Sequence, residues 1–181
     1  MIFSPTPLNG AYTIEVDPLT DERGWLARTF CKNEFNTIGH TGEWVQLNHS
    51  FTNMTGTLRG MHYQLHPYSE IKLVRCIAGA VFDVIIDLRK HSKGFLQWFG
   101  TELSATNKKM IYIPAGFAHG FQTMSDDSEL IYHHSQFYMP GAEAGIRYDD
   151  PKLKIDWPLT VTNISNRDDQ HPYLDENFKG I

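Results

Sequence analysis

Runs in which apolar and polar residues alternate recur along the chain, and clusters of turn-forming residues separate them. The alternation is clearest at residues 11–16, 44–51 and 57–75, and side chains that alternate between two faces are typical of strands. Residues 81–89, VFDVIIDLR, form an almost continuous apolar and β-branched run, which predicts a well-buried strand. The pattern therefore predicts many short strands joined by turns, with little helix.

Local signals predict the remaining elements. The DERG sequence at 21–24 predicts a charged turn. Phe35 and Ile38 stand at helical spacing, which predicts a short helix that begins at Lys32 and ends at Gly39. Additional short strands are predicted at residues 25–30, 96–103, 110–114 and 129–138.

Two further segments are predicted to lie outside the strands. Gly116 and Gly120 flank His119, which predicts a loop around this histidine before the chain returns to a strand. Near the C-terminus, the residues 165–168 begin with a serine and end with an aspartate. They predict the cap of a short turn or helix.

Short strands separated by turns are typical of an all-β sandwich or barrel. A chain of 181 residues can bury one sizeable core, and it contains no linker or internal repeat, so residues 1–181 are expected to form one domain. In a barrel, polar side chains that point inward from several strands meet at the mouth, where small ligands bind.

Composition narrows the possible functions. The formal net charge of -5 argues against a non-specific nucleic-acid binder, although local arginines and lysines can still form a pocket for a small anion. Two cysteines, Cys31 and Cys76, form no disulfide framework or zinc spacing. We find no signal peptide and no apolar run long enough to cross a membrane, so a soluble, cytoplasmic protein is expected.

Residues 57–75, TLRGMHYQLHPYSEIKLVR, carry the first indication of chemistry, and they predict a strand, a turn and a second strand. His62 and Gln64 would share one face, whereas His62 and Lys72 would meet only if the two strands pair or line one cavity. For any one of these residues, a strand face in contact with water is the simpler explanation. Their combination with more distant residues favours a site.

A metal site is the first alternative, because nine histidines is a high number. Small metal-binding barrels draw two ligands from a His-x-His pair, but here that position reads His62-Tyr63-Gln64, and His133 and His134 would point to opposite faces. His62 and His66 are four residues apart but not on a helix, so the sequence predicts no zinc or iron site. It also contains no Gly-x-Ser-x-Gly motif and no reactive cysteine setting for nucleophilic hydrolysis.

Metal-free acid–base chemistry is the alternative that fits. His62 is a suitable base near neutral pH, and Asp168 or Asp169 could hold its tautomer if the C-terminal segment folds back. Tyr132 can donate a proton, and Lys72 can stabilise an oxyanion. Such a set suits removal of a proton next to a carbonyl and its return from the other face.

Several sequence motifs, in order and almost from end to end, are similar to those of one known family. The chain resembles the dTDP-4-dehydrorhamnose 3,5-epimerase family, which are metal-free epimerases of nucleotide sugars. The resemblance implies an all-β cupin-type jelly-roll barrel with short peripheral helices, no cofactor, and a place in dTDP-rhamnose and polysaccharide biosynthesis. The motifs are DERG (21–24), QLNHS (46–50), GTLRGMHYQ (56–64), KLVRCIAGAVFDVIIDLR (72–89), IYIPAGFAHGFQTMSD (111–126), IRYDDP (146–151), IDWPL (155–159) and SNRDDQHP (165–172).

The resemblance also implies a role for individual residues. His62 is implied as the base, Tyr132 as the acid on the opposite face and Lys72 as the stabiliser of the enolate. Asp168, rather than Asp169, is implied as the partner of His62, because the family's aspartate stands three residues after a serine and four before a proline. The residues implied to bind substrate are Arg23, Arg28, Gln46, Asn48, Arg59, His119 and Tyr138.

Family members are dimers that exchange N-terminal strands, so a homodimer is expected in which Arg23 serves the partner's site. Many members carry phenylalanines and a glutamate after DERG that contact the nucleobase, whereas this chain reads Trp25, Leu26, Ala27 and Arg28. His133 stands where a lysine is common. The alternatives are therefore an epimerase of a CDP-linked or other nucleotide-linked keto sugar, a non-catalytic sugar-nucleotide-binding cupin, and a metal-dependent cupin oxygenase.

Overall fold

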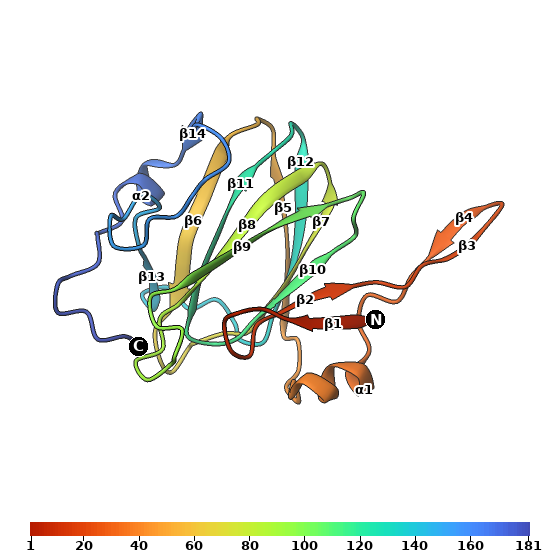
Figure 1. Ribbon diagram of the computed structural model, residues 1–181, viewed down its shortest axis with the longest axis horizontal. Coiled ribbons are helices and arrows are strands. Elements are labelled where there is room, and N and C mark those ends of the chain that lie inside the picture. The colour runs from red at the N-terminus through yellow and green to blue at the C-terminus, as the bar shows by residue number, and fades with distance from the viewer.

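Two six-stranded sheets face each other in the computed structural model, which describes residues 1–181 (Figure 1). The first sheet has the order β1 (Ile2–Pro5), β2 (Tyr12–Glu15), β10 (Met110–Ile113), β7 (Lys72–Ala78), β12 (Ser128–His134) and β5 (Gln46–Thr52). The second has the order β13 (Glu143–Gly145), β6 (Thr57–Gln64), β11 (Phe117–Thr123), β8 (Ala80–Asp87) and β9 (Trp98–Ser104), and β14 (Asn163–Ile164) pairs with β6.

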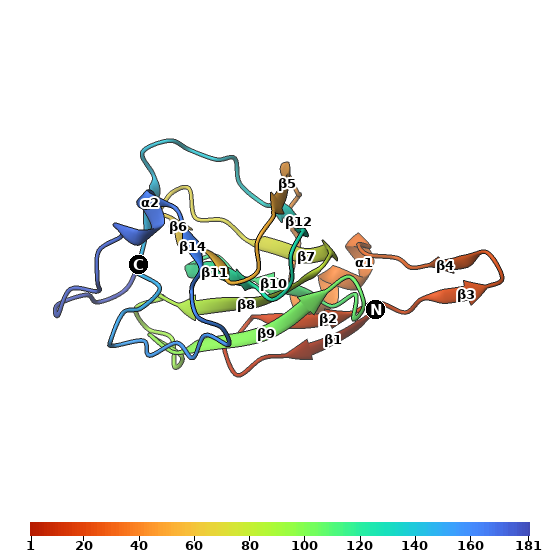
Figure 2. The same ribbon diagram turned by 90° about the horizontal axis from the view of Figure 1, so that it is seen from above.

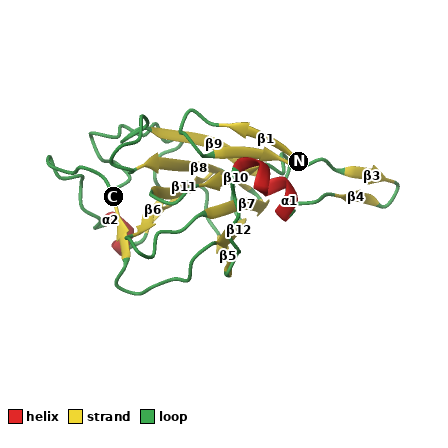
Figure 3. Cartoon of the chain, turned by 90° about the horizontal axis from the view of Figure 1, so that it is seen from below, coloured by secondary structure: helices red, strands yellow, loops and turns green.

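The helices are few and lie at the periphery of the sheets (Figure 3). Helix α1 (Lys32–Phe35) continues into the 3-10 turn η1 (Asn36–Ile38), and α2 (Asn166–Asp169) lies near the C-terminus. Strands β3 (Leu19–Asp21) and β4 (Gly24–Leu26) form a separate hairpin that extends away from both sheets in two views (Figures 1 and 2). No helix combines the length and the apolar character that a membrane crossing requires.

Apolar side chains fill three regions around the sheets. Inward-facing residues of both sheets, such as Val74 and Ile85, form the largest cluster between them. The C-terminal segment covers the outer face of the second sheet, where Leu153 and Leu174 pack against Val84. Phe35 of α1 covers part of the outer face of the first sheet. Because each sheet is buried on two faces, β8 carries apolar residues almost continuously.

Most predicted elements are present. The strands at 57–64 and 72–78, the DERG turn between β3 and β4, and the helical segment that ends at Gly39 are confirmed, and Gly39 adopts the expected left-handed conformation. The Ser165 hydroxyl accepts a hydrogen bond from the Asp168 amide at 3.1 Å, so the predicted cap is also confirmed. The all-β prediction is therefore confirmed.

Other predictions about elements were wrong in part. His119 lies within β11 and not in a loop, and β12 ends at His134 and not at 138. The strands predicted at 25–30 and 96–103 are shorter or displaced, at Gly24–Leu26 and Trp98–Ser104. Strands β1 and β13 were not predicted, because each contains four residues or fewer, too few to show a period.

The glycines beside His119 serve a close approach between strands and not a turn. In the pairing of β6 with β11, His62 opposes His119 and Arg59 opposes Phe121, so β6 carries one extra residue in a β-bulge. A Cβ atom on Gly60 would lie 2.5 Å from the Cα atom of Gly120. The bulge matters for function because it lets Arg59 and His62, three residues apart, both line cavities between the sheets.

Candidate active site

Two adjoining cavities, of about 520 and 230 Å³, lie between the sheets and share Asn48, Lys72 and His134 in their walls. The larger is also lined by Arg59, His119 and Tyr132, with Leu47, His49, Ser50 and Phe121. The smaller is also lined by His62, Gln64 and Tyr138, with Gln46, Tyr63, Glu70 and Glu143. Strands β6 and β7 belong to different sheets and do not pair. They instead place His62 and Lys72 along one cavity, which is the second of the two arrangements in which these residues were predicted to meet.

His62 forms a close pair with Asp168. The Nε2 atom of His62 lies 2.8 Å from Oδ1 of Asp168, which α2 carries to the end of β6. The other carboxylate oxygen, Oδ2, accepts a hydrogen bond of 3.1 Å from the Gly60 amide within the bulge. The C-terminal segment therefore folds back on the barrel, and Asp168 rather than Asp169 contacts the histidine.

The carboxylate of Asp168 is ionised at neutral pH. Burial acts to raise its pKa, but the hydrogen bond and charge of His62, the Gly60 amide and the charge of Arg167 outweigh burial and hold the pKa at about 2. An ionised carboxylate has no hydrogen to donate, so Nε2 of neutral His62 carries the proton. The lone pair of this imidazole is then on Nδ1, which makes Nδ1 the basic atom.

Arg167 and His171 surround this pair, and sequence reasoning had not found either. Arg167 forms an ion pair of 3.0 Å with Glu143, and its Nη2 lies 3.4 Å from Nε2 of His62. The Nε2 atom of His171 lies 3.7 Å from Oδ1 of Asp168. Both residues flank Asp168 in the SNRDDQHP motif, and nearness in sequence to a proposed catalytic residue is the signal that could have indicated them.

Lys72 is buried beside a carboxylate that sequence reasoning had also missed. Its Nζ atom lies 3.2 Å from Oε1 of Glu70, and Oε2 of Glu70 lies 2.7 Å from Nδ1 of His134. Burial acts to raise the pKa of Glu70, but His134 and Lys72 outweigh burial and lower it. The ammonium group of Lys72 is therefore held in place by an anion that spans β7 and β12.

A chain of hydrogen bonds continues from His134 to the mouth of the smaller cavity. Asn48 Nδ2 lies 3.3 Å from Nε2 of His134, and Gln46 Nε2 donates to Oδ1 of Asn48 at 3.1 Å. Oε1 of Gln46 accepts from the amide of Tyr138 at 3.0 Å, and the Tyr138 hydroxyl donates to Glu143 at 3.2 Å. The predicted residues Gln46, Asn48 and Tyr138 are thus brought together beside His62.

Tyr132 reaches the larger cavity from β12. Its hydroxyl lies 3.1 Å from the Ser50 hydroxyl, and its ring packs against those of His119 and His134 with centroid distances of 6.2 Å. Burial raises the pKa of Tyr132 far above its ordinary value, so the phenol keeps its proton at neutral pH. The side chain can therefore act as a proton donor.

A second histidine–carboxylate pair lies deeper in the larger cavity. Nε2 of His119 is 2.8 Å from Oδ2 of Asp83, and Asp83 is completely buried. Burial raises the pKa of Asp83, and its Oδ1 atom has no hydrogen-bond partner. On the neighbouring strand β6, Nε of Arg59 donates to the Thr52 hydroxyl at 3.0 Å, and this arginine has no carboxylate partner.

Two predicted substrate-binding residues lie outside these cavities in the single chain. Arg23 is on the β3–β4 hairpin, where it pairs with Asp21 and its side chain is 84% exposed. Arg28 forms an ion pair of 2.9 Å with Glu34 and lines a different surface pocket. The structure therefore brings together nine of the eleven predicted site residues, namely His62, Asp168, Tyr132, Lys72, Gln46, Asn48, Arg59, His119 and Tyr138.

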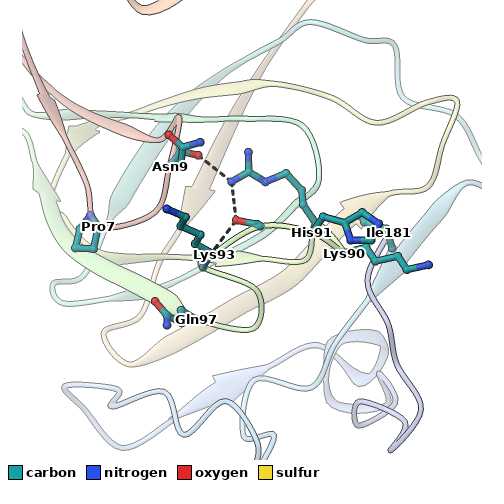
Figure 4. Close-up of a pocket in the computed structure, with 10 residues that line it drawn as sticks. Pro7, Asn9, Lys90, His91, Lys93, Gln97 and Ile181 are labelled. Atoms are coloured by element: carbon teal, nitrogen blue, oxygen red, sulfur yellow. Dashed lines mark hydrogen bonds between the residues drawn. The ribbon is translucent and has the colours of Figure 1, made fainter.

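A larger cavity, of about 780 Å³, lies elsewhere (Figure 4). Basic residues line it, including Lys90, His91 and Lys93, but none of the predicted site residues does. Arg89 in its wall is already paired with Asp87. The two adjoining cavities between the sheets combine a base, an acid and a buried cation. They are therefore the better candidate for an active site.

Comparison with known proteins shows which family the chain is similar to. The model of the dTDP-4-dehydrorhamnose 3,5-epimerase family matches residues 5–176. A dTDP-4-dehydrorhamnose 3,5-epimerase of Shigella flexneri is 46% identical over 149 residues, which cover 82% of each chain. Another, of Methanothermobacter thermautotrophicus, is 42% identical over 178 residues, which cover 97% of this chain and 95% of that one.

A solved structure gives the same result for the fold. The 3,5-epimerase of Legionella pneumophila, determined in complex with dTDP-4-keto-L-rhamnose, superposes with a TM-score of 0.90 at 38% identity, over 95% of this chain and 92% of that chain. The predicted cupin-type jelly roll is therefore confirmed. The protein belongs to the dTDP-4-dehydrorhamnose 3,5-epimerase family.

Proposed function

We propose that the protein is an isomerase that epimerises a dTDP-linked 4-keto-6-deoxy sugar, converting dTDP-4-dehydro-6-deoxy-D-glucose to dTDP-4-dehydro-L-rhamnose. The observation that carries this proposal is the pairing of His62 with ionised Asp168 beside a cavity that also holds Lys72 and Tyr132. His62 lines the smaller cavity and Tyr132 the larger one, while Lys72 lines both. A sugar that spans the two cavities would have a base and an acid at different sides.

His62 would begin the reaction. Hydrogens on C3 and C5 are weakly acidic because they flank the C4 ketone. Nδ1 of His62 takes one of them, the C–H bond breaks, and its electron pair moves to form an enolate on the C4 oxygen. The imidazolium that results is stabilised by the Asp168 carboxylate at 2.8 Å, which has no tendency to take the proton itself.

Lys72 and Tyr132 would complete each epimerisation. The ammonium group of Lys72, which is buried, stabilises the enolate oxygen, and burial strengthens such an interaction. The Tyr132 hydroxyl then gives its proton to the carbon from the opposite face, which inverts the configuration. Afterwards the tyrosinate regains a proton and His62 releases one, so the enzyme returns to its starting state with no net proton consumed.

The remaining polar residues of the cavities would bind the nucleotide sugar. Arg59 lines the cavity without a carboxylate partner, which leaves its charge available for the diphosphate. His119 would donate a hydrogen bond to the sugar, and Gln46, Asn48 and Tyr138 would line the nucleotide side.

Cys31 and Cys76 are both free thiols, which supports a reducing, cytoplasmic setting.

We also propose a homodimer. Leu19 and Leu26 on the β3–β4 hairpin are 72% and 73% exposed, and Trp25 beside them is half exposed. Apolar patches of this kind often form protein interfaces. A second copy packed on the hairpin would give Arg23 and Arg28 a cavity to serve. Light scattering should report a mass of two chains, and a monomer would contradict the proposal.

Isotope exchange tests the reaction. The protein is incubated in deuterated water with dTDP-linked and CDP-linked 4-keto-6-deoxy sugars, and deuterium at C3 and C5 is counted by NMR. We expect incorporation at both carbons of the dTDP-linked sugar. Deuterium only in the CDP-linked sugar would identify the alternative nucleotide, and no incorporation in any sugar would favour the non-catalytic binding protein.

A further inference from the structure

Three potential metal ligands meet at the base of the smaller cavity. One ligand atom from each of His62, Asp168 and His171 lies within 4.8 Å of the other two. The individual distances to Oδ1 of Asp168 are 2.8 Å from His62 and 3.7 Å from His171. Ligand atoms around a tetrahedral zinc ion with bonds of about 2.0–2.1 Å are about 3.3 Å apart, and each of the two distances to Asp168 is within about 0.5 Å of this value.

The backbone brings His171 to this position. Gly145 of β13 pairs with His62 of β6, and the imidazole of His171 packs directly on Gly145. A Cβ atom at Gly145 would lie 2.3 Å from Nε2 of His171, so only glycine leaves room for the ring. The rings of His62 and His171 meet edge to face, with centroids 5.5 Å apart. The segment after α2 therefore holds the imidazole of His171 beside that of His62 on β6.

The chemistry of the three groups suits a divalent cation. Imidazole nitrogens and a carboxylate oxygen are ligands that zinc accepts in proteins. Nε2 of His171 is buried and has no hydrogen-bond partner, which is an uncommon state for a polar atom. The Oδ1 atom of Asp168 lies 3.7 Å from this nitrogen. A buried nitrogen without a hydrogen-bond partner, next to a carboxylate, is available to bind a metal ion.

We infer that His62, Asp168 and His171 form a binding site for Zn²⁺ or a similar borderline metal ion, and that the ion inhibits the enzyme by occupying the base. Two imidazoles and a carboxylate match the ligand preference of zinc and leave a fourth position for water. The hydrogen bond between His62 and Asp168 is then replaced by two metal–ligand bonds, and the displaced Nε2 proton moves to Nδ1. This transfer occupies the Nδ1 lone pair that proton abstraction needs.

Arg167 is the one cation that the incoming ion must displace. Its side chain is 57% exposed and pairs with Glu143, so it can rotate away from His62 without leaving a buried charge. The site differs from the His-x-His position of metal-dependent cupins, because His171 comes from the segment after α2 and not from the barrel strands. The inhibitory consequence rests on the proposed function, whereas metal binding itself does not.

Titration calorimetry of the purified full-length protein with Zn²⁺, in the absence of substrate, tests the site. We expect one ion per chain, little heat with Mg²⁺, and a dissociation constant at least about tenfold higher in His171→Asn. His91→Asn, which removes an exposed histidine of the distant basic cavity, is the matched control and should bind zinc as the wild type does. Equal affinity in wild type and His171→Asn would overturn the inference.

Two further measurements make the result independent of folding and of turnover. Should His171→Asn not fold, the imidazole ¹⁵N resonances of the wild type decide the question. Shifts of the Nε2 signals of both His62 and His171 upon zinc addition support the site, and unchanged signals overturn it. With substrate, zinc should abolish deuterium exchange and EDTA should restore it. Failure of every sugar to react would refute the proposed function and leave the binding result intact.

Discussion

Two histidine–carboxylate pairs of the site have the same hydrogen-bond length, but their carboxylates lie in different surroundings. His62 and Asp168 are 2.8 Å apart, and so are His119 and Asp83. Asp168 receives a further hydrogen bond from the Gly60 amide and the charge of Arg167, and its pKa falls to about 2. Asp83 is fully buried with one oxygen unpaired, and burial raises its pKa.

The difference shows that distance alone does not identify a catalytic base. A carboxylate that is firmly ionised can hold the imidazole in one tautomer and stabilise its cation. A carboxylate that burial pushes toward its neutral form stabilises that cation less well. In addition, the His62 side chain is 25% exposed and can exchange protons with solvent, whereas that of His119 is only 6% exposed. We therefore assign the base to His62 and hydrogen bonding to His119.

Removing each imidazole in turn gives the largest expected effect. His62→Ala should lower kcat/KM about 10³–10⁴-fold and abolish deuterium exchange at the substrate, because no other base is placed to take the proton. His119→Ala should lower kcat/KM about 10²-fold, with exchange still measurable by NMR. Circular dichroism confirms that both variants fold. Exchange that survives in His62→Ala and disappears in His119→Ala would reverse the assignment.

Neutralising each carboxylate separates the pairs further. Asp168→Asn preserves the size of the side chain but permits the wrong tautomer of His62, so kcat should fall about 10³-fold with little change in KM. Asp83→Asn should change kcat about tenfold or less. Steady-state kinetics of both variants at neutral pH measures the difference. Equal losses in the two variants would mean that the pairs are catalytically equivalent.

Acid unfolding tests the opposite pKa shifts. Asp168 has a lower pKa folded than unfolded, so its ionised form stabilises the protein by about 2 kcal/mol above about pH 4, and this contribution is lost as the pH falls toward 2. The stabilities of wild type and Asp168→Asn should therefore converge on acidification. The pKa of Asp83 is raised in the folded state, so its protonation stabilises the folded wild type as the pH falls. Asp83→Asn lacks this gain and should therefore become less stable relative to wild type at lower pH. Denaturant melts at pH 2–6 measure both trends.

A third pair, Glu70 with His134, extends the comparison and carries the smallest expected effect. Glu70 also contacts Lys72, so Glu70→Gln should act through the lysine and lower kcat about tenfold, mainly by releasing the ammonium group from its position. The pH profile of kcat should shift in this variant, and Glu70→Asp should restore part of the activity. A variant with an unchanged profile would show that Glu70 is only structural.

Much of this arrangement could be predicted from local sequence. The alternation through 57–75 predicted β6 and β7, and the serine three residues before Asp168 predicted the cap that holds this aspartate. The four proposed catalytic residues were all identified before the structure was known. They carry chemistry that few structural roles need, and the family motifs surround them in the sequence.

The missed residues share a physical cause. Glu70, Glu143 and His171 take their importance from contacts between different sheets or segments, and no periodicity within one strand encodes such contacts. His119 was predicted in a loop because a glycine next to a histidine resembles a turn. In the structure, Gly120 instead avoids a clash with β6, since a Cβ atom there would lie 2.7 Å from the carbonyl oxygen of Arg59. A single strand's sequence cannot distinguish these two uses of glycine.

The bulge at Gly60 has a consequence for anyone who wishes to move this chemistry into another barrel. Transplanting the side chains of His62 and Asp168 alone would leave the carboxylate without the amide that anchors its second oxygen. That amide is free only because β6 carries an extra residue, and the extra residue fits only opposite Gly120. A designer would therefore copy Gly60 and Gly120 before copying any charged group. A library screen should change these two positions together, because each makes room for the other.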